Sequence, residues 1–272
     1  MTIFQSIILG IVQGLTEFLP VSSSAHLVLF PWLLDWKVPG LAFDAFLHLG
    51  TIVAVVGYFF GDFWRIFKAG LLSILERKIG YESERLQFWM LVIGTIPGGL
   101  AGYFLHDMVE ETFRAPLLIA IPLAVVGCLL YWVDGRYPTN RRIEDLKLSD
   151  AIWIGVSQAF AIFPGVSRSG ATMTMGRYLG MNREASARFS FLLSLPIIAA
   201  AGVFKGKELL GESEMQVSMG VLVAGFLSAT IVGLIAIHLL LALLRSADFA
   251  IFAWYRLGLA GFIVIWSLFF GG

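Results

Sequence analysis

Long apolar runs separated by short polar segments dominate the chain. A membrane-spanning helix needs about 20 mostly apolar residues. Six runs are long enough or nearly so, and they occupy residues 42–60, 87–105, 115–133, 187–204, 217–244 and 249–270. We predict that each is a transmembrane helix. Because 58% of the residues are hydrophobic and only 14% are charged, the expected fold class is an all-α polytopic membrane protein.

Two shorter apolar runs, residues 3–19 and 150–163, each run into a cluster of Pro, Gly and Ser, namely "FLPVSSSAH" and "FPGVSRSG". This pattern predicts two broken, re-entrant pairs of half-helices. Irregular backbone at membrane depth needs partners from protein or from a water-filled cavity, so both breaks should face inward. The alternative interpretation is an interfacial helix followed by a surface loop.

An internal repeat relates the two broken helices. A shift of 145 residues aligns residues 6–27 with 151–172 without a gap and with seven identities. The same shift aligns 42–59 with 187–204, again with seven identities, where apolar composition alone would give roughly two per block. We therefore predict one membrane domain (1–272) made of two repeats, 1–145 and 146–272.

The number of spans in each repeat predicts how the two repeats are related. Each contains one re-entrant pair and three spans, and an odd number of spans turns the second repeat upside down. Corresponding broken helices in an inverted-topology repeat point to a binding site near the bilayer midplane. The two breaks should form the two walls of that site.

The charges exclude some functions and predict an orientation. Lys and Arg balance Asp and Glu at 19 each, so no net basic field recruits nucleic acid, and the single cysteine rules out a Cys/His metal cluster. Basic residues follow the first and third spans, whereas the other side has only Lys37, Arg114, Lys205 and Lys207. By the positive-inside rule the first set is cytoplasmic, and the first break enters from outside.

The first break holds several groups that can do chemistry. Gln13 and Glu17 are four residues apart and share one helix face, just before Pro20 stops the helix. His26 lies in the first turn of the next half-helix. That half-helix starts with hydroxyls that can cap free N–H groups where the helix dipole favours an anion, and these are Ser22, Ser23 and Ser24.

The second break repeats this arrangement with Ser167 and Ser169, but Arg168 stands where the first has Ser23. A charged group at membrane depth costs about 2.5–3.5 kcal/mol, so Glu17 and Arg168 indicate function. An anion clamp, a hydroxyl nucleophile and an acid/base pair together suit phosphoryl transfer. Two alternatives stay open: the serines only cap helices, and Arg168 forms a buried structural bridge with Glu17.

Asp44 and His48, four residues apart at the outer start of the first span, are a further polar pair near the expected entrance. An interfacial hydrogen bond is the simpler interpretation of this pair.

"VQGLTEFLPVSSSAHL" together with "PGVSRSGATMT" resembles the undecaprenyl-diphosphate phosphatase family, also called bacitracin-resistance proteins. The resemblance covers essentially the whole chain. It implies a multi-pass enzyme of the bacterial inner membrane that converts undecaprenyl diphosphate to undecaprenyl phosphate. It also implies a divalent cation, Mg²⁺ or Ca²⁺. Because the positive-inside rule places the first break toward the outside, we expect the site to open to the periplasm.

The family motifs fall on particular residues of this sequence. The first motif maps to Gln13, Glu17, Ser23 and His26, and the second to residues 164–172 with Arg168 as the phosphate-binding arginine. Many relatives carry Glu where this chain has Gln13, which leaves Glu17 as the expected metal ligand. Further substrate contacts are expected at Ser22, Ser24, Ser167, Ser169, Gly170 and Thr172.

The expected mechanism has Ser23 attack the terminal phosphorus while His26 or Glu17 takes its proton. Histidine can itself accept a phosphoryl group, so His26 is the alternative nucleophile. A lipid-phosphate transporter or flippase would use the same anion site without chemistry, and a structural scaffold would not explain the charged residues. The expected partner is a polyprenyl diphosphate in the membrane, and homo-oligomerisation stays open.

Overall fold

The chain is described by a computed structural model over residues 1–37, 41–79, 83–138, 140–211 and 218–269. Within these ranges it is built of α-helices and two single-turn 3₁₀ segments. The α-helices are α1 (Ile3–Thr16), α2 (Ser23–Leu33), α3 (Leu41–Tyr58), α4 (Phe60–Leu75), α5 (Ser83–Thr112), α6 (Pro116–Arg136), α7 (Leu148–Ala159), α8 (Arg168–Tyr178), α9 (Arg183–Gly211), α10 (Met219–Leu243) and α11 (Ala250–Phe269).

Four helices are long and apolar enough to cross a membrane, namely α5 (over Ser83–His106), α6, α10 and α11. They cover, to within one or two residues at the ends, the predicted spans at 87–105, 115–133, 217–244 and 249–270, of which residues 217 and 270 lie outside the described residues. This confirms the expected membrane class. A fifth span is possible if α3 and α4 count together, although these helices bend by 84° at their junction. The count of six spans stays a prediction, because α9, which contains the window 187–204, is not among the helices found in the described residues to be long and apolar enough to cross a membrane.

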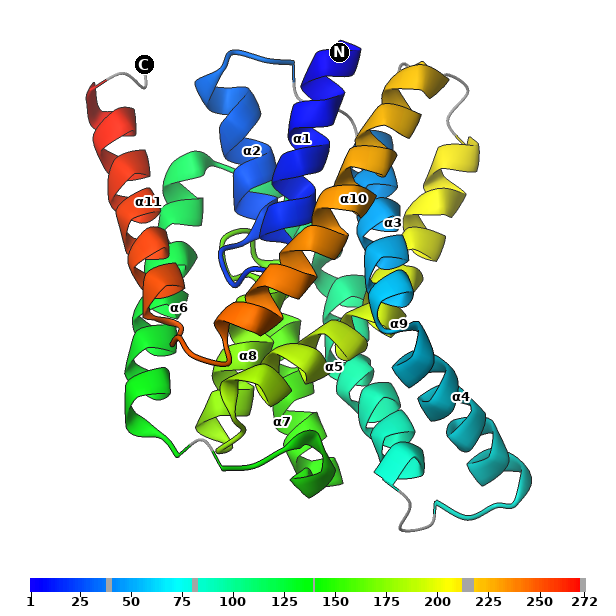
Figure 1. The fold of residues 1–272 in the computed structure, drawn as a ribbon. Helices are drawn as coiled ribbons and strands as arrows, with labels where there is room; N and C mark the ends of the chain where they lie inside the picture. The colour runs from blue at the N-terminus through cyan, green and yellow to red at the C-terminus, as the bar shows by residue number, and fades with distance from the viewer. Residues whose placement is uncertain (38–40, 80–82, 139, 212–217, 270–272) are drawn as a thin grey trace.

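Helix–break–helix units occupy the two predicted positions. α1 and α2 are joined by residues 17–22 and lie in the half of the molecule that carries the chain termini (Figure 1). α7 and α8 are joined by residues 160–167 and lie in the opposite half. The breaks meet in the middle, where Ser169 Oγ donates to the Leu19 carbonyl at 3.0 Å. The first break is largely buried, and in the second Gly165, Val166 and Ser167 are buried, which favours inward-facing breaks over surface loops.

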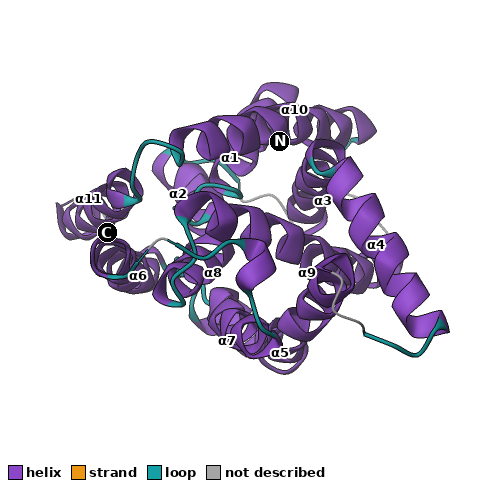
Figure 2. Cartoon of the chain, turned by 60° about the horizontal axis from the view of Figure 1, so that its bottom comes forward, coloured by secondary structure: helices purple, strands orange, loops and turns teal. Residues whose placement is uncertain are grey.

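Each broken helix packs against a helix from the other half of the chain. α1 lies along α10, and α7 lies along α5 (Figure 2). Glycines at equivalent repeat positions permit both contacts: a Cβ on Gly10 would lie 2.5 Å from the Gly225 carbonyl oxygen, and one on Gly155 would lie 2.4 Å from that of Gly94. Small residues let membrane helices approach closely, which explains why both positions are glycine.

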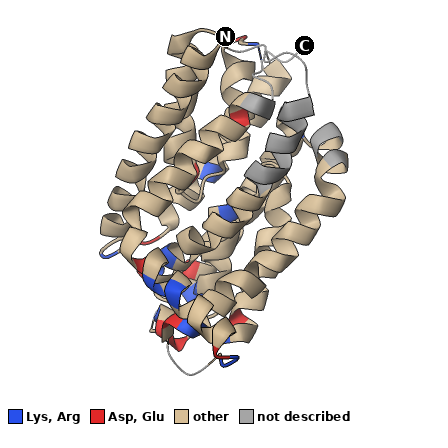
Figure 3. Ribbon diagram, turned by 90° about the vertical axis from the view of Figure 1, so that its right-hand side faces the viewer, with Lys and Arg blue, Asp and Glu red and all other residues tan. Residues whose placement is uncertain are grey.

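Charged side chains gather at the end of the molecule away from the chain termini (Figure 3). There the carboxylate of Asp134 accepts hydrogen bonds from Arg177 Nε at 2.6 Å, from Arg183 Nε at 3.0 Å and from the Phe249 main-chain N–H at 3.0 Å. Arg177 is fully buried and donates also to main-chain carbonyls at the end of α6. These contacts tie α6, α8, α9 and α11 together at this end.

Candidate functional site

The two breaks share an uncommon backbone conformation. Ser22 has a φ of 76° and Ser167 has a φ of 72°, and the two serines are equivalent in the repeat. Each caps the helix that follows: Ser22 Oγ accepts from the Ala25 N–H, and Ser167 Oγ accepts from the Gly170 N–H. A positive φ at a non-glycine residue costs about 1–3 kcal/mol and concentrates at functional sites. The caps therefore fix where α2 and α8 begin.

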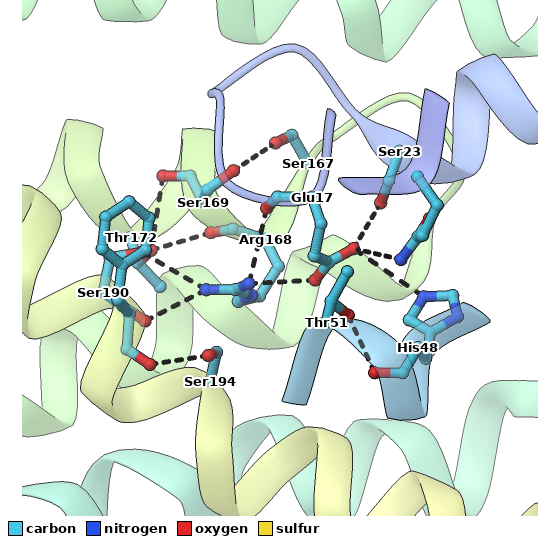
Figure 4. A network of polar contacts seen from close by, with 12 residues as sticks. Glu17, Ser23, His48, Thr51, Ser167, Arg168, Ser169, Thr172, Ser190 and Ser194 are labelled. Carbon is cyan, nitrogen blue, oxygen red and sulfur yellow. Dashed lines mark hydrogen bonds and ion pairs between the residues drawn. The ribbon is translucent and has the colours of Figure 1, made fainter. Parts of the chain in front are cut away.

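The carboxylate of Glu17 is the centre of the polar contacts between the breaks (Figure 4). Glu17 is 7% exposed, and its Oε2 accepts from Ser23 Oγ at 2.7 Å and from Gln13 Nε2 at 3.1 Å. Its Oε1 accepts from Arg168 Nη2 at 2.9 Å. His48 Nε2 lies 3.8 Å from Oε2. Side chains from both breaks and from α3 thus converge on one carboxylate.

Arg168 bridges the first break to α9. Its Nη1 donates to the Ser190 carbonyl at 3.0 Å, while Thr172 Oγ1 lies 2.7 Å from Ser190 Oγ. Within the described part of the chain, the buried Nε of Arg168 and the Oε1 of Gln13 have no hydrogen-bond partner. Each such buried, unsatisfied polar atom calls for a ligand or an ordered water. The buried Arg168–Glu17 bridge that the sequence left open as an alternative is present. It leaves Arg168 Nε without a partner among the described residues, so this N–H can still donate to a ligand.

An open cavity of about 450 Å³ adjoins this cluster. Its polar lining comes from the two breaks with the helix starts that follow them and from α3, α5 and α7, namely Glu17, Ser23, Ser24, His48, Tyr103, His106, Gln158, Ser167 and Arg168. Its other walls are apolar or glycine and include Leu49, Ile52, Gly98, Gly99, Gly102, Ile162, Ile197 and Ile198. A mainly apolar pocket with a few convergent polar groups suits an amphiphile with an anionic head.

The remaining predicted site residues lie just behind this lining. Ser22 and Ser24 share a contact of 3.2 Å between their hydroxyls, as Ser167 and Ser169 do at 3.1 Å. Gln13 supports Glu17 from α1. Gly170 and Thr172 lie in the first turns of α8, where they bond the Ser167 cap and Ser190.

His26 does not lie with Glu17 and Ser23 as we expected. Its Nδ1 is 2.7 Å from the Ser22 carbonyl, and its Nε2 is 2.7 Å from the Tyr255 hydroxyl of α11. The two rings stack with centroids 5.7 Å apart. Because a carbonyl only accepts, Nδ1 carries the proton, and the bond to its own helix cap directs the ring toward α11. His26 is consequently absent from the cavity lining.

Several residues of the site went unrecognised in the sequence. Ser190 and Tyr255 carry no motif that would have marked them. His48 was noted only as part of a polar pair with Asp44, and its Nδ1 in fact bonds the Asp44 main-chain carbonyl at 2.8 Å. Gln158 did have a signal, since it is identical to Gln13 under the repeat shift, and its buried Oε1 also has no partner among the described residues.

Fold and site together define a multi-pass membrane protein with a mainly apolar cavity on which a few polar groups converge. The family model of the bacitracin resistance protein BacA matches residues 6–262. The chain is 48% identical to an undecaprenyl-diphosphatase of Pelotomaculum thermopropionicum, covering 97% of this chain and 96% of that protein. It is 47% identical to one of Caldicellulosiruptor bescii, covering 98% of both. The chain belongs to the bacitracin resistance protein family.

Proposed function

We propose that this chain is an undecaprenyl-diphosphatase, which hydrolyses undecaprenyl diphosphate to undecaprenyl phosphate and phosphate. Family membership and the names of close relatives support this activity. One structural observation carries the proposal: Arg168, Glu17 and Ser23 converge at the polar lining of a cavity whose other walls are apolar. That combination accommodates a diphosphate joined to a hydrocarbon chain.

The cavity suggests how the substrate lies. The diphosphate faces Arg168 and the N-termini of α2 and α8, where N–H groups and the helix dipoles favour an anion. The prenyl chain follows the glycines of α5 and the isoleucines of α9. Gly102 offers particular room, because a Cβ there would meet no atom within 4 Å.

The contacts favour Ser23 as the nucleophile and Glu17 as its base. Ser23 Oγ already donates to Glu17 Oε2 at 2.7 Å, so the carboxylate can take the proton as Oγ attacks the terminal phosphorus. The bond from that phosphorus to the bridging oxygen breaks, and undecaprenyl phosphate leaves. Water then cleaves the phosphoserine, and the proton returns to Oγ. Arg168 neutralises charge on the equatorial oxygens.

The oxygen donors beside Glu17 fit a divalent cation. Gln13, whose Nε2 donates to the Glu17 carboxylate, has an Oε1 with no partner among the described residues. Mg²⁺ commonly uses one or two carboxylates, with substrate phosphates and water as its other ligands. The described residues contain no cluster of three or more His, Cys, Asp or Glu, so most ligands would come from the substrate and water. Glu17 and Gln13 would hold the ion, which would supply further charge neutralisation.

We also propose the inverted repeat and an orientation with the site open to the periplasm. The broken helices enter from opposite ends and each packs on the other half, as two inverted units would. The end rich in Lys and Arg would be cytoplasmic. The cavity extends along α5 from Gly98 toward His106, away from that end.

Phosphate release from farnesyl or undecaprenyl diphosphate by the detergent-purified protein tests the activity. We expect release that requires a divalent cation, stops with EDTA and collapses in Arg168→Ala and Ser23→Ala. Folded protein that binds the lipid without releasing phosphate would instead support the transporter alternative. Retained release in Ser23→Ala would reject the proposed nucleophile but not the phosphatase.

A further inference from the structure

Arg256 of α11 is fully buried, and main-chain carbonyls are its hydrogen-bond partners. Its Nη1 donates to the Pro20 carbonyl at 3.0 Å, and its Nη2 donates to the Gly165 carbonyl at 2.8 Å. The guanidinium also contacts carbonyls of Pro122, Leu123 and Val166 at 3.3, 3.1 and 3.0 Å. No carboxylate in the described part of the chain forms an ion pair with it.

Two of these contacts, those to the Pro20 and Gly165 carbonyls, are equivalent in the repeat. Pro20 and Gly165 are 145 residues apart, and each precedes by two residues the serine that caps the following helix. One guanidinium therefore holds the same carbonyl of both breaks. Carbonyls buried in these breaks would lose free energy if left without a donor. Holding both from a single rigid group fixes the distance between the breaks.

Arg256 also lies directly behind the first turn of α8. A Cβ on Gly170 would be 3.1 Å from Arg256 Nη1. Its positive charge adds to that of the α8 N-terminus, on the side of the helix remote from the cavity, whose lining does not include Arg256. Apart from this charge, the residue acts on the site through the segments that it holds.

We infer that Arg256 is a positioning residue that sets the geometry of Ser23 relative to Arg168 by binding both breaks at once. The inference rests on the proposed phosphatase function. It requires arginine in particular, because a planar fork with five N–H donors can satisfy carbonyls from several segments, whereas a lysine ammonium is a compact charge with three donors. A change that keeps the charge but removes the fork should thus misplace the site without removing any substrate contact.

The test compares Arg256→Lys and Arg256→Gln with Arg177→Lys as the matched control. Arg177 is equally buried and also donates to main-chain carbonyls, but it lies at the charged end and contacts neither break. For each purified variant we would measure thermal stability, kcat and KM for farnesyl diphosphate, and the Kd for this lipid. Rates would be expressed per folded molecule.

Both Arg256 variants should lower kcat per folded molecule by about tenfold to a hundredfold, because misplacement of reacting groups by about an ångström has effects of this size. Arg177→Lys should lower thermal stability but keep kcat within about twofold of the unchanged protein. Unchanged kcat in folded Arg256→Lys and Arg256→Gln would overturn the inference. So would failure of both to fold, since Arg256 would then serve folding alone.

The lipid-binding measurement separates this inference from the proposed function. If the unchanged protein released no phosphate, the phosphatase proposal would fail. Weaker farnesyl diphosphate binding in Arg256→Lys, with Arg177→Lys unaffected, would still support a positioning role at the anion site. If the unchanged protein, Arg256→Lys and Arg177→Lys instead bound farnesyl diphosphate equally, the positioning role of Arg256 would be rejected.

Discussion

Glu17 has two tasks at the residue scale, because its two oxygens bind different partners. Oε1 pairs with Arg168, and Oε2 accepts from Ser23 and Gln13. Burying such a pair stabilises little by itself, but removing one member leaves an uncompensated charge at a cost of about 3–5 kcal/mol. A test of the base must therefore separate lost chemistry from lost stability.

Glu17→Gln keeps the size of the side chain but removes the acceptor for the Ser23 proton. We expect kcat to fall by about 10²–10⁴-fold, the usual contribution of a positioned base, with a smaller change in KM. Steady-state phosphate release at saturating farnesyl diphosphate measures this. Glu76→Gln is the control, since this carboxylate is half-exposed outside the site and pairs with Arg85. A Glu17→Gln enzyme with nearly full kcat would exclude Glu17 as the base.

The nucleophile can be identified by its stability to acid. Ser23 lines the cavity, whereas both ring nitrogens of His26 are bonded outside it, so Ser23→Ala should lower kcat by about a thousandfold or more and His26→Ala by about tenfold. Quenching during turnover of labelled substrate should trap acid-stable phosphoserine. An acid-labile phosphohistidine that disappears in His26→Ala would contradict the assignment.

At the scale of elements, the sequence predicts where the two helix breaks lie. It does not predict every change of direction between helices or every side-chain orientation. Pro20 and the glycine–serine clusters predict where helices stop, because proline and capping hydroxyls act within a few residues. The 84° bend between α3 and α4 falls at the end of the predicted span 42–60, between Gly57 and Gly61, but neither a proline nor a side-chain cap there predicts its direction. The partner of His26 Nε2, Tyr255, is 229 residues away and so lies beyond any local pattern.

The glycines of α5 should determine which chain lengths the enzyme accepts. Gly102→Leu would project a side chain into the proposed prenyl path, because open space surrounds this position. We expect KM for undecaprenyl diphosphate to rise roughly tenfold, and that for a short prenyl diphosphate to change less. Gly261→Leu on α11 is the control, since it also meets open space but does not line the cavity. Equal increases in KM for the long and the short substrate would show that the prenyl chain does not pass Gly102.

At the scale of the whole molecule, the repeat accounts for features that single helices do not. The 145-residue shift pairs Gly10 with Gly155, Ser22 with Ser167 and Pro20 with Gly165, and in the structure each pair has matching surroundings. Sequence identity could reveal the equivalence. It could not reveal that α1 packs on α10 or that Arg256 joins the breaks, because these contacts link segments with no shared pattern.

The orientation of the protein in the membrane decides from which side its substrate is supplied. Single cysteine substitutions can test this orientation. Asp35 and Glu144 are exposed at opposite ends of the molecule, the former near the termini and the latter at the charged end. With Cys128 replaced by Ser, Asp35→Cys should react with an impermeant maleimide in intact cells, and Glu144→Cys only after permeabilisation, because the basic end should face the cytoplasm. The reverse pattern would open the cavity to the cytoplasm, and the enzyme would then act on diphosphate lipid presented from inside the cell.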